Sequence, residues 1–193
     1  MEFVRTESAP IVFNHAVRVY VLGELIGRAR GMEIDSELFF LGAICHDLGQ
    51  TERFIGNERF EVEGADAAAQ WLRARGVEDH RAEIVWEAIA LHGTGIIAER
   101  KRPEIALVAL GATADLIGAS PTDVPPETVQ TVMRTIPRLR MKHDYVRVLV
   151  EMARRRPIET TIGTPLADFG HAHIPGFEPV VFERLMRAAP YDE

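Results

Sequence analysis

The sequence has a single cysteine among its 193 residues, which excludes an internal disulfide and fits a reducing compartment. It lacks an apolar run long enough to cross a bilayer, and its first residues lack the basic start and apolar core of a signal peptide. Long basic blocks are also absent, and the formal charge of −7 argues against nucleic acid or a membrane as partner. We therefore expect a cytoplasmic protein that acts on a small-molecule substrate, and a homo-oligomer is compatible with these features.

Helix-forming residues dominate the composition, and β-branched residues rarely alternate with polar ones, which predicts an all-α fold. The length suits one domain, so we expect a single-domain helical bundle over residues 1–193. Its motif-bearing core should span about residues 11–118, with additional helices and a loop over 119–193. Start and stop signals predict helices over about 8–26, 36–46, 60–75, 81–92, 103–117, 127–136, 142–155 and 180–188, with loops over 51–59, 119–126 and 157–179.

The most informative feature is the dipeptide His46-Asp47, which closes an apolar segment and is followed by Leu48-Gly49. Adjacent residues on a helix point about 100° apart. Both side chains can therefore bind one ion only where the helix stops and the backbone turns, and we expect Gly49 to supply that stop.

Two distant residues are candidate companions of this pair. Asp115 carries the only charge in the apolar run 105–117, and a buried carboxylate needs a metal, a cation or several donors. His15 lies on an apolar helical stripe made by Ile11, Val12, Val19, Leu22 and Ile26. The plainer alternative is that His15 is a core histidine bonded to a carbonyl and that Asp115 is a structural carboxylate paired with an arginine.

The set of His15, His46, Asp47 and Asp115 offers nitrogen and oxygen ligands, which suit a borderline divalent ion, and it lacks the thiolates of a purely structural zinc site. Such an ion lowers the pKa of its bound water from about 15.7 towards about 7 and makes hydroxide available for attack on carbon or phosphorus. A nearby side chain must then carry protons, and Glu63 and His92 are the candidates by residue type. Each has an alternative interpretation as a charge at a helix end.

The order of these residues resembles the HD superfamily of metal-dependent hydrolases, which are all-α proteins. The segments NHAVRVY (14–20), HDLGQT (46–51), RFEVEGA (59–65) and ALH (90–92) are most similar to its cyanamide hydratase-like branch. The resemblance implies that His15, His46, Asp47 and Asp115 hold one divalent ion. We expect zinc first, with iron, manganese, cobalt or nickel as alternatives. Glu63, His92 and Thr51 would line the pocket, and Arg18 and Phe60 are further pocket candidates.

Three functions remain open at this point. The local motifs favour a hydratase in which a metal-bound water attacks cyanamide or another nitrile-type compound. The wider family favours a phosphohydrolase of a small phosphate ester or nucleotide, although Gln50 stands where HD nucleotidases carry an acidic residue. A metal-binding sensor without catalysis is the alternative of another class.

Overall fold

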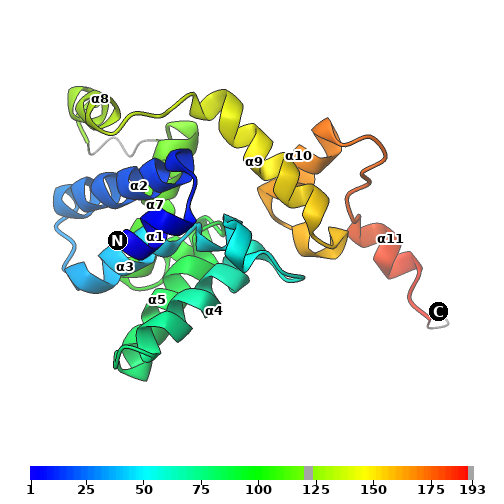
Figure 1. Ribbon diagram of the computed structural model, residues 1–193, viewed down its shortest axis with the longest axis horizontal. Helices are drawn as coiled ribbons and strands as arrows, with labels where there is room; N and C mark the ends of the chain where they lie inside the picture. Colours follow the sequence, from blue (N-terminus) through cyan, green and yellow to red (C-terminus); the bar gives the residue numbers. More distant parts are fainter. Residues whose placement is uncertain (120–123, 191–193) are drawn as a thin grey trace.

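Helices make up the regular structure of residues 1–119 and 124–190, the part of the chain that the computed structural model describes, and no strand occurs there (Figure 1). The predicted all-α class is therefore confirmed. Half of the predicted connection over 119–126, residues 120–123, lies outside the described part.

The helices follow the predicted order, with additions. The short helices α1 and α6 were not predicted, because four to six residues are too few to show a helical period. The elements are α1 (Glu2–Glu7), α2 (Pro10–Ala29), α3 (Ser36–Cys45), η1 (Leu48–Gln50), η2 (Glu52–Phe54), α4 (Phe60–Arg73), α5 (Asp79–Leu91), α6 (Ile96–Glu99), α7 (Pro103–Ile117), α8 (Pro126–Thr135), α9 (Met141–Arg155), η3 (Ile158–Thr161), α10 (Pro165–His173) and α11 (Phe182–Arg187).

The centre of the bundle is the contact between α2 and α7, and glycines make it close. A Cβ atom on Gly111 would lie 2.4 Å from the Val19 carbonyl oxygen, and one on Gly23 would lie 2.8 Å from the Leu107 carbonyl oxygen. A side chain at either position would therefore force the two helices apart. Helices α3 and α5 add buried side chains such as Phe39 to the same core.

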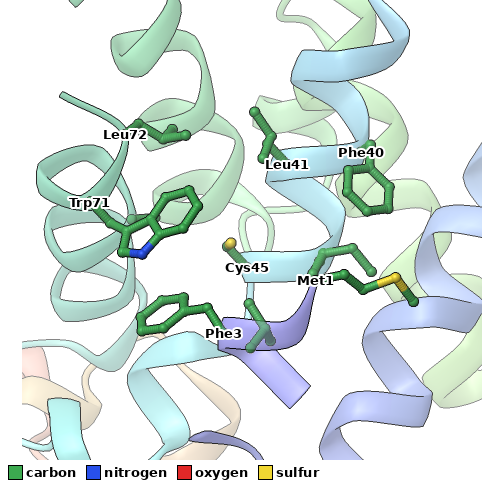
Figure 2. Close-up of a pocket in the computed structure, with 10 residues that line it drawn as sticks. Met1, Phe3, Phe40, Leu41, Cys45, Trp71 and Leu72 are labelled. Carbon is green, nitrogen blue, oxygen red and sulfur yellow. The ribbon is translucent and has the colours of Figure 1, made fainter. Parts of the chain in front are cut away.

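A second core joins α3, α4 and α5, and the N-terminal helix α1 covers one edge of it. Phe3 of α1 stacks on Trp71 of α4 with ring centroids 5.5 Å apart, and Arg75 lies over the other part of that indole ring. Figure 2 shows Phe3, Trp71 and Cys45 around a small cavity whose walls are almost entirely apolar. Cys45 is thus partly buried and packs against this core.

Helices α9 and α10 lie side by side at the edge of the bundle, where Figure 1 shows them in yellow and orange. A third apolar cluster attaches them to the bundle through Val12 of α2 and Phe60 of α4. Helix α10 corrects the predicted loop over 157–179. Thr164 caps its first turn, and Gly170 is not a helix breaker there, because its missing side chain makes room for the Phe177 ring.

In the described part of the chain, no helix is both long and apolar enough to cross a bilayer. Helix α2 has 20 residues but carries Arg18, Glu24 and Arg28, and α7 has only 15 residues.

Candidate metal centre

The backbone turns at the His46-Asp47 pair itself, within one residue of the predicted helix end at 46. Helix α3 ends at Cys45, His46 keeps helical angles, and Asp47 has φ −103° and ψ 15° before η1 begins. Gly49 therefore does not stop the helix. It is needed because a Cβ atom there would lie 1.9 Å from the Phe60 carbonyl oxygen, so only glycine lets η1 pack against the start of α4.

Three of the four predicted ligands meet at one buried point. Nε2 of His15 lies 3.3 Å from Nε2 of His46, and Oδ2 of Asp47 lies 3.6 Å and 3.3 Å from these two nitrogens. Two donors bound tetrahedrally at about 2.1 Å are about 3.4 Å apart. The spacing and the chemistry of this donor set therefore fit a divalent ion.

Hydrogen bonds at the opposite ring nitrogens leave the inward-facing nitrogens free. Nδ1 of His46 donates to the Ala43 carbonyl at 2.8 Å, and Nδ1 of His92 donates to the Ile89 carbonyl at 2.7 Å. Since a carbonyl only accepts, both Nδ1 atoms carry a proton, so in the neutral ring each Nε2 carries the lone pair that a metal binds. Nε2 of His92 lies 3.8 Å from Oδ1 of Asp47, which makes His92 a candidate fourth donor.

Asp115 lies behind His15 and outside the three-residue cluster. Its Oδ2 is 2.6 Å from Nδ1 of His15, on the side of the ring opposite the cluster. Arg18 donates to both of its carboxylate oxygens at 2.8 Å, and Arg138 donates to Oδ1 at 3.1 Å. Asp115 is therefore paired with arginine, as in the alternative to the metal-ligand prediction given in the sequence analysis. A carboxylate in that position orients the imidazole and raises its basicity towards a metal.

The carboxylate of Asp47 is held by two side chains that were not among the predicted site residues. Gln50 donates to Oδ1 at 2.6 Å, and the Tyr145 hydroxyl lies 2.9 Å from Oδ2 and 2.8 Å from the Gln50 amide nitrogen. Tyr145 comes from α9, about a hundred residues away in sequence. No local pattern signals such a contact.

The electrostatics of the cluster keep the carboxylates charged. Burial alone would raise the pKa of Asp47, but His46, His15 and His92 together hold that pKa well below its usual range. Burial likewise opposes ionisation of Asp115, but hydrogen bonds from His15 and Arg18 lower its pKa to about 2. Burial lowers the pKa of His15, which favours the neutral imidazole that a metal requires.

A cavity of about 390 Å³ opens onto the cluster, within the size range of small-molecule sites. The sequence did not mark Arg138, Lys142 or any apolar residue of α9 and α10 as part of it. The charged and metal-ligating side chains that line it include His15, His46, Asp47, Glu61, His92 and Arg138.

The acidic residue of α4 that lines the cavity is Glu61, not the predicted Glu63. The two are two residues apart on a helix, so their side chains point about 200° apart. Glu61 is buried and paired with Arg59 at 3.0 Å. Glu63 points the other way, accepts from the Glu58 amide and pairs with the buried Arg156, which directly follows α9. The sequence-based prediction identified the correct turn of the helix but selected Glu63, which faces away from the cavity.

Of the remaining pocket candidates, Phe60 lines the cavity, whereas Thr51 and Arg18 do not. Phe60 lines the cavity and lies 5.9 Å from the His92 ring, centroid to centroid. Thr51 is buried and donates to the Leu48 carbonyl, so it closes a turn and does not face the cavity. Arg18 is fully buried on Asp115, so its guanidinium cannot clamp a phosphate in the cavity.

Comparison with known proteins assigns a family to most of this region. A family model described as HD domain matches residues 12–134, which is more than half of the chain and includes the three clustered residues. No curated protein matches the chain.

Proposed function

Since the chain belongs to the HD domain family, we propose that it is a metal-dependent hydrolase that releases phosphate from an organic phosphate ester. The observation that carries the proposal is the convergence of His15, His46 and Asp47 at one end of a cavity of small-molecule size. These three residues would hold one divalent ion, for which zinc is our first expectation, and His92 would offer a fourth donor. When bound, such an ion supplies Lewis-acid stabilisation of charge and a water that loses its proton near neutral pH.

Charge in the cavity supports an anionic substrate. Asp47 and Glu61 contribute two negative charges to the lining, and Arg138 and Lys142 contribute two positive charges. A divalent ion would leave the cavity with a net positive charge of about two, and a phosphomonoester dianion would neutralise it.

The chemistry requires one proton to move. Hydrolysis forms a bond from phosphorus to a water oxygen and breaks the bond from phosphorus to the ester oxygen, so a proton passes from the water to the departing alkoxide. Glu61 lines the cavity, and its charge acts on the neighbouring His92. We assign the proton transfer to Glu61, in place of the Glu63 of the sequence-based hypothesis.

The hydratase alternative has weaker support. A cavity of about 390 Å³ is far larger than cyanamide, since one water molecule takes about 30 Å³ of liquid volume. A neutral nitrile also has no use for the two cations in the lining. The sequence segments that resemble the cyanamide hydratase-like branch remain its support, and a direct assay separates the two reactions.

The test combines metal analysis with turnover. We expect the purified protein to contain about one equivalent of a divalent ion and to release phosphate from para-nitrophenyl phosphate, with both properties lost in Asp47→Ala. The matched control is Asp168→Ala, which changes an exposed aspartate of α10. Cyanamide converted to urea without phosphate release would favour the hydratase. Bound metal without any turnover would favour a sensor, and protein that never binds metal would refute the proposal.

A further inference from the structure

The cavity lining is polar where Tyr145 of α9 meets Asp47 and apolar at Leu149, one turn further along the same helix. The metal-ligating and charged side chains lie with Asp47 and Arg138, and Lys142 precedes Tyr145 by one turn on α9. The remaining wall comes from α7, α9 and α10 and is built mainly from apolar side chains, including Leu116, Val146, Leu149, Leu166 and Phe169.

The polar groups of that wall already have partners. The Thr113 hydroxyl donates to the Ala109 carbonyl of its own helix at 2.9 Å. The Tyr145 hydroxyl is engaged with Asp47 and Gln50. A sugar or nucleobase bound against α9 and α10 would therefore bury donors and acceptors without partners, which disfavours binding of such groups.

Most of the residues named in this apolar wall also lie outside the family-matched region. The match ends at residue 134, whereas Val146, Leu149, Leu166 and Phe169 all follow it. Leu166 and Leu149 are buried and belong to the cluster that fixes α9 and α10 to the bundle, so this wall is a packed surface of defined shape. The matched region provides the candidate metal-binding residues, and the segment beyond it provides most of the wall that would contact the rest of the substrate.

From this division we infer that the substrate is a phosphate ester of an apolar alcohol, aromatic or aliphatic, and that α9 and α10 select it by excluding polar alcohols. The inference rests on the proposed function, which supplies the phosphate at the metal end. The apolar group would lie along Leu149, Leu166 and Phe169.

A homologous series of substrates tests the inference. We expect kcat/KM for phosphate release to rise about fourfold for each methylene from para-methylphenyl to para-ethylphenyl to para-propylphenyl phosphate, because each buried methylene adds a similar increment of apolar transfer. Glycerol phosphate and adenosine monophosphate should be at least about tenfold poorer than the propyl compound. A flat series, or better turnover of the polar esters, would overturn the inference and leave the hydrolase proposal standing.

Binding provides a readout that does not need turnover. The matching para-alkylbenzylphosphonates cannot be hydrolysed, and calorimetry should show Kd falling about fourfold per methylene. If no ester releases phosphate but the phosphonates keep this trend, the proposed function fails and the apolar selectivity stands. If affinity is independent of the alkyl length, the selectivity fails.

A matched pair of variants locates the effect. Phe169→Ala shortens a cavity-lining side chain of α10 and should at least halve the increment per methylene. Phe182→Ala changes a 78% exposed phenylalanine of α11 and should leave the series unchanged. An equal effect of both variants would overturn the assignment to α10. If Phe169→Ala does not fold, the substrate and phosphonate series of the unaltered protein still decide the inference.

Discussion

Glu61 and Glu63 lie two residues apart on the first turn of α4. Replacing Glu61 with glutamine should lower the rate of turnover, whereas replacing Glu63 should lower the stability of the fold. Glu61 faces the cavity and pairs with Arg59, whose side chain is 37% exposed. Glu63 faces away from it and pairs with Arg156, whose side chain is fully buried. Glutamine keeps the shape of either side chain and removes only its charge and its capacity to carry a proton.

For Glu61→Gln the expected loss is in rate. A positioned proton carrier contributes about 10²- to 10⁴-fold, so kcat should fall by at least about a hundredfold with the metal still bound. The pair with Arg59 is partly exposed and screened by solvent, so the free energy of unfolding should change by less than about 1 kcal/mol.

For Glu63→Gln the expected loss is in stability. Nη2 of Arg156 also donates to the Gly49 carbonyl at 2.7 Å, but its Nε and Nη1 have no hydrogen-bond partner among the described residues. Breaking a buried ion pair costs about 3–5 kcal/mol, and the glutamine oxygen should recover part of this, which leaves about 2–3 kcal/mol. At about 2–4 °C per kcal/mol for a chain of this size, Tm should fall by about 5–10 °C.

The assay is thermal unfolding of both variants, followed by phosphate release at a temperature where each remains folded. We expect Glu61→Gln to be stable and slow, and Glu63→Gln to be unstable and within about threefold of the original rate. A slow but stable Glu63→Gln protein together with a fully active Glu61→Gln protein would refute the placement of the two carboxylates and restore the sequence-based choice of Glu63.

Three further predictions address the packing and the cluster. Gly111→Ala should lower the free energy of unfolding by about 1–3 kcal/mol in urea titration, because its Cβ atom would lie 2.4 Å from the Val19 carbonyl oxygen; unchanged stability would contradict the close contact of α2 and α7. Tyr145→Phe should weaken metal binding by about 10- to 100-fold in chelator competition, because Asp47 loses a hydrogen bond. The circular dichroism spectrum should stay unchanged, and an equal metal affinity would show that the hydrogen bond is dispensable. Burial raises the pKa of the Cys45 thiol to about 12, so at pH 8.5, where an ordinary cysteine is about half thiolate, the folded protein should react with a disulfide reagent far more slowly than the protein in urea. Equal rates would place the thiol in contact with solvent.

The fold was predictable to the extent that it depends on local pattern. Helices α2 and α7 were found because apolar side chains recur along them at helical spacing and a proline opens each one. Helix α10 was missed because it is short and contains Gly170. It is stabilised by packing of Leu166 in the cluster with α9 and by the contact of Gly170 with Phe177, seven residues further on.

The sequence by itself determined which side chains needed partners. An imidazole on an apolar stripe, a lone carboxylate in an apolar helix and a His-Asp pair at a helix end are costly to bury alone, and that cost is visible in the sequence of His15, Asp115 and His46-Asp47. Only the tertiary structure decided which partners they have. It placed Asp115 behind His15, turned Glu61 towards the cavity and Glu63 away from it, and brought Tyr145 onto Asp47. These choices depend on helix rotation and on contacts between residues about a hundred positions apart, and the local periodicity of a chain carries no record of either.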